Sequence, residues 1–170
     1  MKHELFISYS DADYDKVKLI IEELKSHTTF KPLIIANNRQ AGKLLADKVK
    51  NGINRAHIII PILTENSIKE QWLNQEIGYA TAMNKKIMPI IQRDLIDNLK
   101  GFIHKQIDLP YKYSKGTNVG KLMWRLSEQK KENSDFIKCF KILIKDIEKN
   151  LDNIIKQENK LKTKSAPRSA

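Results

Sequence analysis

Trp72 and Glu76 are the residues of this chain whose types and spacing best suit chemistry. They lie four positions apart, so on a helix both side chains occupy one face and an indole stands beside a carboxylate. The segment that holds them follows an apolar run, Ile58–Leu63, which is typical of a buried strand. Ligands of open α/β sheets bind in the crevice outside the carboxyl ends of the strands. We therefore predict that Glu76 is a catalytic carboxylate in such a crevice.

Each of these residues also has an ordinary structural role that the spacing leaves open. Charged side chains are mostly exposed, so its helix position alone also fits Glu76 as a solvated glutamate. Trp72 is either a wall of a ring-binding site or a core residue. We expect Tyr9 and Tyr79 to be packing residues with hydroxyls at the surface, and Ser8 to be a hydroxyl at a strand end.

Strand-like and helix-like segments alternate along most of the chain. Runs rich in β-formers predict strands, and apolar residues at helical spacing predict helices. The predicted strands are Glu4–Ser10, Pro32–Ile35, His57–Leu63, Lys86–Ile91 and Ile107–Leu109. The predicted helices are Tyr14–Ser26, Leu44–Ala56, a helix through Trp72 and Glu76 that ends near Asn84, a short Asp94–Leu99, and Val119–Lys130. This order predicts an α/β fold, with a flavodoxin-like five-stranded parallel sheet and helices on both faces.

The segment after residue 132 has a different pattern. From Ser134 to Leu161, apolar residues recur at alternating steps of three and four, with Glu158 as the one polar member. Since the stripe is wider than a coiled-coil seam, we favour packing on the domain or in a bundle, and a short dimerising coiled coil stays open. We divide the chain into a domain at residues 1–132, an amphipathic helix for packing or oligomerisation at 133–161, and a disordered tail at 162–170.

Composition and charge limit the classes of partner. With 41% hydrophobic and 30% charged residues, the chain has the composition of an ordinary globular protein. The net charge of +11 suits either an anionic partner or solvated lysine-rich faces. Because no arginine–aromatic interleaving marks a base-stacking surface, we expect no nucleic-acid partner. No run reaches the ~18 apolar residues of a membrane-spanning helix, and we expect no membrane association.

Several common sites have no counterpart in the sequence. The start at Met1–Glu4 does not fit a secretory signal, and the single cysteine, Cys139, agrees with a reducing cytosol, so we expect a cytoplasmic protein. The histidines are scattered, so we expect no metal site. The two common nucleotide-phosphate loops and the hydrolase serine elbow are missing. A phospho-receiver needs an acidic residue after the third strand, where this chain has Leu63–Thr64.

Four segments together resemble a TIR (Toll/interleukin-1 receptor) domain of the bacterial, NAD-cleaving kind. Phe6–Ser10 resembles the first TIR box, and Asn37–Leu44, with Ala41-Gly42-Lys43, resembles the BB loop that follows the second strand. Trp72–Ile77 resembles the W-x-x-x-E segment, and Lys86–Ile91 resembles the strand after it. The resemblance covers roughly residues 3–130 in the right order and spacing, and the C-terminal helix lies outside it.

The resemblance implies an NAD+ glycohydrolase or cyclase with Glu76 as its catalytic residue. Its products would be nicotinamide and either ADP-ribose or a cyclic ADP-ribose-type signal. The residues expected to contact NAD+ are Ser10, Asp11, Gln40, Lys43 and Trp72. Asp11 is equally consistent with a helix N-cap, for which Asp13 is a second candidate. Because nicotinamide leaves as a neutral molecule, one carboxylate suffices, and we expect Glu76 to be ionised at neutral pH.

The resemblance also implies partners and a setting. NAD+ would be the substrate, with no further cofactor. TIR domains of this kind build the site from two protomers, so we expect self-association, with a downstream effector that senses the nucleotide product. The setting would be prokaryotic antiphage immunity. Two other functions stay open: a non-catalytic TIR adaptor that acts through TIR–TIR assembly, and a nucleoside-transferase-like enzyme that also uses a glutamate.

Overall fold

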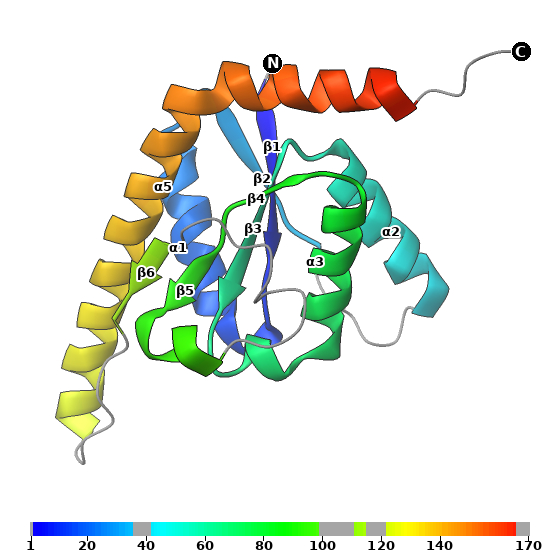
Figure 1. The fold of residues 1–170 in the computed structure, drawn as a ribbon. Coiled ribbons are helices and arrows are strands. Elements are labelled where there is room, and N and C mark those ends of the chain that lie inside the picture. Colours follow the sequence, from blue (N-terminus) through cyan, green and yellow to red (C-terminus); the bar gives the residue numbers. More distant parts are fainter. Residues whose placement is uncertain (1, 36–41, 99–110, 115–121, 166–170) are drawn as a thin grey trace, which may run out of the picture.

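Parallel strands form the centre of the molecule in the computed structural model, which describes residues 2–35, 42–98, 111–114 and 122–165 (Figure 1). The strands are β1 (His3–Ser8), β2 (Phe30–Leu33), β3 (Ile58–Leu63), β4 (Lys86–Ile87), β5 (Ile90–Gln92) and β6 (Tyr111–Tyr113). Their order across the sheet is β2-β1-β3-β5-β6, with β4 also paired to β3, and every pairing is parallel. This order confirms the flavodoxin-like prediction.

The predicted fourth strand, Lys86–Ile91, is interrupted rather than continuous. β4 pairs with Ile58 and Ile59, and β5 pairs with Ile62 and Leu63, in one unbroken register. Pro89 lies between the two pieces and has no N–H to give to the ladder. The two pieces therefore occupy one strand position, which is why a five-stranded prediction matches the sheet.

The last described strand lies later in the chain than the sequence predicted. β6 begins directly after Pro110, and its Ile90–Tyr111 register places it beside β5 at the sheet edge. The predicted strand Ile107–Leu109 lies outside the described residues. Aromatic residues at both ends of β6 supply the β-forming character that the prediction overlooked there.

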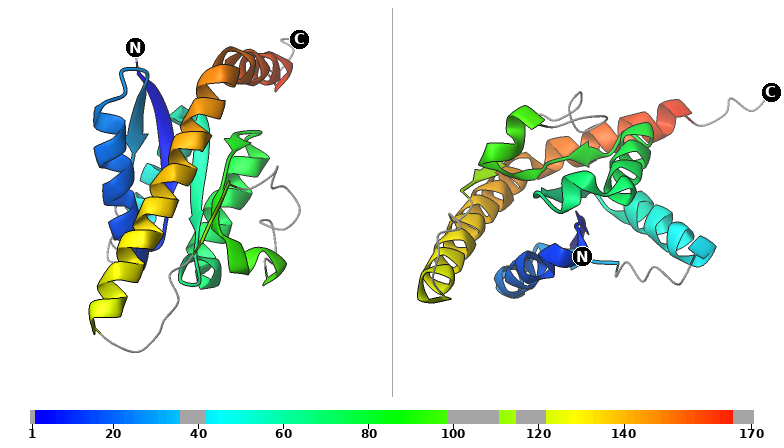
Figure 2. Two further views of the ribbon diagram at one scale, coloured as in Figure 1. Left: turned by 90° about the vertical axis from the view of Figure 1, so that its left-hand side faces the viewer. Right: turned by 90° about the horizontal axis from the view of Figure 1, so that it is seen from below.

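Helices cover both faces of the sheet (Figures 1 and 2). The helices are α1 (Tyr14–Lys25), α2 (Gly42–Arg55), α3 (Gln71–Ala82) and α5 (Leu122–Ser165), with short 3-10 turns η1 (Asp11–Asp13), η2 (Ser67–Lys69) and η3 (Arg93–Asn98). α1 and α5 lie on one face, and α2 and α3 lie on the other. Among the described residues, no helix is both long and apolar enough to cross a membrane.

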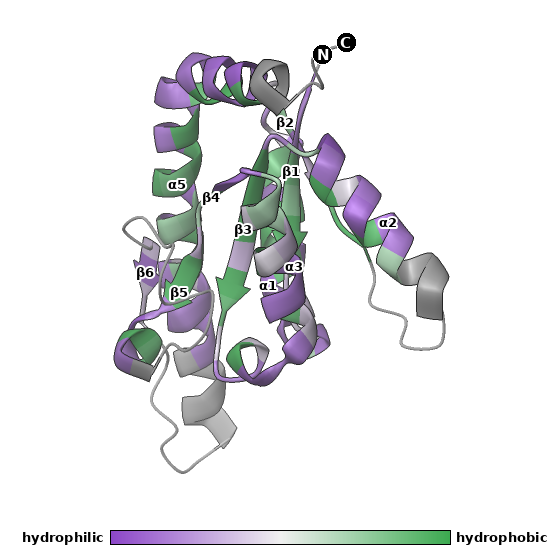
Figure 3. Ribbon diagram, turned by 45° about the vertical axis from the view of Figure 1, so that its right-hand side comes forward, coloured by the Kyte–Doolittle hydropathy of each residue, from purple (hydrophilic) through white to green (hydrophobic). Residues whose placement is uncertain are grey.

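The alternation of side chains along β1 divides the core into two layers. Leu5 and Ile7 pack with α1 and α5, whereas Phe6 packs with α2 and α3. β3 divides in the same way, with Ile60 on the first side and Ile59 on the second. Both faces of these strands are thus apolar, as Figure 3 shows by their green colour. The next position on the Phe6 side of β1 is Ser8, which therefore faces α3.

α5 is one helix where the sequence predicted two. It runs without a break from Leu122 to Ser165, so the expected gap between residues 130 and 134 is absent, and residues 162–165, expected in a disordered tail, continue the helix. Residues 166–170 of that tail lie outside the description. The predicted apolar stripe packs on the domain, with Phe140, Ile144 and Ile147 fully buried. Leu161, at the end of the stripe, is 41% exposed.

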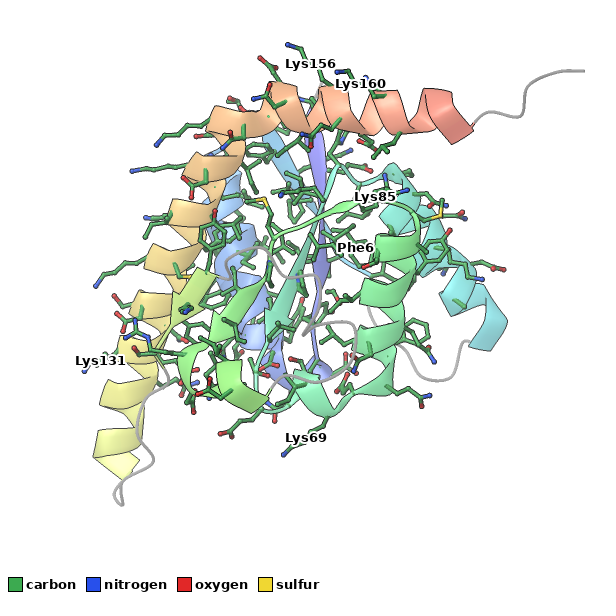
Figure 4. The ribbon with its side chains drawn as sticks, in the orientation of Figure 1. Phe6, Lys69, Lys85, Lys131, Lys156 and Lys160 are labelled. Atoms are coloured by element: carbon green, nitrogen blue, oxygen red, sulfur yellow. The ribbon has the colours of Figure 1, made fainter. Side chains whose placement is uncertain are left out.

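A bend turns the end of α5 across the amino-terminal edge of the sheet (Figure 1). We call this orange-to-red end, which carries Lys156 and Lys160, the terminal arm (Figure 4). Lys85 fastens the arm, because its side chain is only 4% exposed and its Nζ donates to Glu158 Oε1 at 2.7 Å. The same Nζ donates to the carbonyl oxygens of Asn54 at 2.7 Å and Ala56 at 2.8 Å. One ammonium group therefore joins the arm to the end of α2.

Replacing Lys85 with methionine is expected to lower the free energy of unfolding by about 2–4 kcal/mol, because a partly buried carboxylate and two carbonyls lose their donor. Urea unfolding measures the change, and limited proteolysis should cut the terminal arm first. The matched control is Lys156→Met on the arm itself, where the side chain points away from the sheet (Figure 4). We expect that substitution to stay within about 0.5 kcal/mol of the wild type. Equal effects of the two substitutions would contradict the role of Lys85 in fastening the terminal arm.

Candidate active site

Glu76 lies on the sheet-facing side of α3. It falls within the buried stripe formed by Leu73, Ile77 and Ala80, and only 5% of it is exposed. The alternative that Glu76 is a solvated helix glutamate is therefore wrong. Charged side chains are rarely buried to this degree without a partner, so its surroundings decide its chemistry.

Ser8 provides the partner. The Ser8 hydroxyl, at the carboxyl end of β1, donates a hydrogen bond to Glu76 Oε2, and Ser8 is 1% exposed. The sequence predicted only a strand-end hydroxyl at this position and missed its role at the site. The available signal was the alternation of β1, since Phe6 on the α3 side of the sheet places Ser8 on that side too.

Burial dominates the ionisation of Glu76. Loss of water around the carboxylate raises its pKa from the ordinary 4.5 to about 7. The Ser8 hydrogen bond and the Trp72 indole act in the opposite direction, and the nearby charge of Glu70 adds a smaller increase in the pKa. This result corrects the expectation that Glu76 is ionised throughout the neutral range, because a pKa near 7 leaves about half of the carboxyl groups protonated there.

Trp72 and Glu76 line a small cavity between α2 and α3. Its volume is about 90 Å³. The lining residues are Ala46, Val49, Lys50, Ile53, Trp72, Gln75, Glu76 and Tyr79. The buried Trp72 Nε1 makes no hydrogen bond to any described residue, so we treat the indole as a polar neighbour of the carboxylate and not as its donor. Sites for whole ligands typically measure roughly 300–1,000 Å³, so this cavity holds only a ring-sized group.

The predicted NAD+ contacts are only partly brought together. Ser10 is buried, and its hydroxyl donates to Glu70 Oε1 at 2.7 Å. Asp11 is exposed at the start of η1, at the same carboxyl-terminal edge of the sheet. Lys43 lies in the first turn of α2, and its side chain and all of Gln40 lie outside the described residues. Of the predicted contacts whose side chains the structure describes, only Trp72 lines the cavity with Glu76.

Asp13 joins the loops beside the site instead of capping a helix. It is the residue before α1, but its side chain makes no capping hydrogen bond, and neither does that of Ser10 before η1. The buried Asp13 carboxylate instead accepts hydrogen bonds from Thr64 Oγ1 at 2.5 Å and Asn66 Nδ2 at 3.4 Å. It therefore ties the loop after β1 to the loop after β3 and fixes the segment that leads into α3.

Within the described ranges, no group of three or more histidine, cysteine, aspartate or glutamate side chains is placed to hold a metal ion. Cys139 is buried, and burial raises the pKa of its thiol to about 12, so it is not a nucleophile near neutral pH. Burial thus gives the Glu76 carboxyl group, but not the Cys139 thiol, a pKa near neutrality.

Comparison with known proteins shows which family and which proteins this chain resembles. A family model described as "TIR domain" matches residues 5–123. Over 80 residues the chain is 28% identical to Toll-like receptor 2 of Homo sapiens and 29% identical to that of Bos indicus. These alignments cover 46% of the chain but 10% of each receptor, so the chain spans a small fraction of these curated relatives.

Among solved structures, the TIR domains of the activated Roq1 resistosome that directly recognises the pathogen effector XopQ share the fold. The TM-score is 0.54 at 15% identity, over 86% of this chain and 99% of that one. A 2-desoxiribosyltransferase from Leishmania mexicana is 19% identical over 56% of this chain and 70% of that one. Its TM-score of 0.46 is too low to indicate a shared fold.

Proposed function

Because the chain belongs to the TIR domain family, we propose that it cleaves the nicotinamide–ribose bond of NAD+, as a glycohydrolase or a cyclase. The observation that carries the proposal is the buried Glu76 carboxylate, which Ser8 holds and which opens onto a cavity beside Trp72. The products are nicotinamide and either ADP-ribose or a cyclic ADP-ribose-type molecule.

The chemistry needs only one carboxylate. When the bond between ribose C1′ and the pyridinium nitrogen breaks, both electrons go to the nitrogen, and nicotinamide departs as a neutral molecule. Positive charge develops on the ribose, and an anionic Glu76 in a water-poor site stabilises it. Water then attacks C1′ and loses one proton, which gives ADP-ribose. In the cyclic alternative, a ring nitrogen of adenine in the same molecule attacks C1′ with its lone pair, and the adenine base then releases one proton. The second carboxylate of most glycosidases, which protonates the leaving group, has no task here.

The size of the cavity supports a site completed by assembly. A volume of about 90 Å³ accommodates the nicotinamide ring but not the rest of NAD+. Self-association through TIR domains supplies the remaining contacts, together with Ser10, Asp11, Gln40 and Lys43 at the carboxyl-terminal edge. The nucleotide product then acts as a signal for a downstream effector, in prokaryotic antiphage immunity.

Incubating the purified protein with NAD+ at high protein concentration tests the proposal. We expect nicotinamide to accumulate, and a mass spectrum of the second product distinguishes ADP-ribose from a cyclic form, which is lighter by one water. A rate per chain that rises with protein concentration supports assembly of the site. Absence of NAD+ turnover at any protein concentration, including in the presence of a polymerising TIR partner, would contradict the proposed enzymatic activity.

A non-catalytic adaptor is the second candidate, and the same small cavity favours it. The adaptor would pair with other TIR domains and use Glu76 only as a buried structural residue. It predicts concentration-dependent self-association without nicotinamide release. Nicotinamide release, measured on a sample of the self-associating protein, therefore distinguishes the two functions.

The rate of NAD+ cleavage is expected to follow the ionisation of Glu76. Since its pKa is about 7, the rate should rise with pH across neutrality and level off above about pH 8. Ser8→Ala removes a donor that lowers this pKa, so the rising limb should move to higher pH. Ser26→Ala, an exposed hydroxyl at the end of α1, is the matched control. A pH–rate profile that stays in place in Ser8→Ala would exclude the role given to Ser8.

A further inference from the structure

A second and larger cavity lies at the opposite edge of the sheet. Its volume is about 580 Å³, within the range of small-molecule sites. Lys86, which lines it, is the first residue of β4 and pairs with Ile58, the first residue of β3, so the cavity reaches the amino-terminal edge. The Glu76 cavity shares none of these lining residues. A ligand in the larger cavity therefore does not contact Glu76.

α5 supplies one wall of this cavity with a row of polar side chains. Asp146, Asn150, Asn153 and Gln157 all line it, at spacings of four, three and four that place them on one side of the helix. The apolar part of the lining comes from Ile87 of β4, Met88 directly after it, and Ile154 of α5. All of the polar residues in this row come after the segment that matches the TIR family, which ends at residue 123.

Two contacts hold this wall in place. The Tyr111 hydroxyl donates to Asp146 Oδ2 at 2.8 Å, which joins β6 to α5. Farther along, the Lys85–Glu158 contact fastens the terminal arm one residue after Gln157. Binding therefore does not have to order the helix, and the associated entropy cost is avoided. In Figure 1, the arm crosses the edge of the sheet above β4.

The lining indicates the class of ligand. A primary amide presents a donor and an acceptor side by side, the arrangement that pairs with the edge of a nucleobase such as adenine. A carboxylate accepts hydrogen bonds from ribose hydroxyls. Apolar side chains suit the face of a base. The charged residues in the lining are one cation, Lys86, and one anion, Asp146, so the cavity offers no net charge to attract a phosphate.

We propose that this cavity binds a nucleoside, with the base on the amides of Asn153 and Gln157 and the ribose toward Asp146. The site is separate from the one proposed for NAD+ cleavage and does not depend on that chemistry. The volume admits a nucleoside whole, which the Glu76 cavity does not.

Calorimetric titration with adenosine tests the site, with AMP and ribose as further probes. We expect one adenosine per chain, AMP bound no more tightly than adenosine, and no detectable ribose binding. The double variant Asn153→Leu with Gln157→Leu should weaken adenosine binding about tenfold or more. Both residues are exposed, so their replacement leaves the fold intact, and circular dichroism verifies this.

Two controls separate this site from the active site. Asn159→Leu changes an exposed amide of the terminal arm that does not line the cavity, and adenosine binding should be unaffected. Glu76→Gln should leave adenosine binding unchanged even where it ends NAD+ cleavage. Absence of adenosine binding at millimolar concentration, binding of AMP alone, binding that the double variant does not weaken, or its loss in Glu76→Gln would each overturn the proposal.

Discussion

Replacing Glu76 with glutamine is expected to lower the rate of nicotinamide release from NAD+ by about 10²–10³-fold, the usual effect of removing one preorganised electrostatic contact to a transition state. Glutamine has nearly the shape of glutamate and keeps an oxygen for the Ser8 hydroxyl, so the lining of the cavity keeps its shape. What it lacks is the negative charge that opposes the positive ribose. The initial rate of nicotinamide release, measured by chromatography, reports the loss.

The control for this substitution is Glu22→Gln, which removes an exposed carboxylate from α1 on the opposite face of the sheet. We expect its rate to equal that of the wild type. Light scattering should show the same assembly for both variants, because a change in self-association alone would also lower the rate. Full activity in Glu76→Gln would exclude the catalytic role of Glu76.

Glu76 is also expected to make stability depend on pH. Its pKa is about 7 in the folded chain and near the ordinary 4.5 when unfolded, so between these values the folded state holds the proton more tightly. Rising pH therefore removes stability across pH 4.5–7, and the loss levels off above that range. A pKa difference of this size corresponds to about 3 kcal/mol.

Urea unfolding of wild type and Glu76→Gln at pH 5 and pH 8.5 measures this effect. Because glutamine does not titrate, the variant should gain about 3 kcal/mol relative to the wild type between the two pH values. Taking the difference between the proteins cancels the contributions of the other titrating groups. Glu22→Gln, whose carboxylate is exposed, should show no such gain. An equal difference at both pH values would mean that the Glu76 pKa is not raised.

The amino-acid sequence predicted the architecture because its signals are local. A run rich in β-formers predicted β1, and a nearly all-apolar run predicted β3. Helical spacing predicted α1 and α2 within a few residues of their ends, and the end of α3 was predicted near Asn84. Predictions were poorer where the local pattern competes with packing. Pro89 divides the fourth strand, β6 lies beyond Pro110, and polar residues between 130 and 134 suggested a break that α5 does not have.

The sequence by itself determined that Trp72 and Glu76 share a helix face at the end of a buried strand, because helical periodicity fixes that geometry. Only the tertiary structure decided that this face is buried, that its partner is Ser8, 68 residues away, and that the pKa of Glu76 is raised. It also decided that Lys85 fastens the terminal arm to Glu158. Burial, desolvation and pairing depend on which distant segments meet, and no local pattern records that.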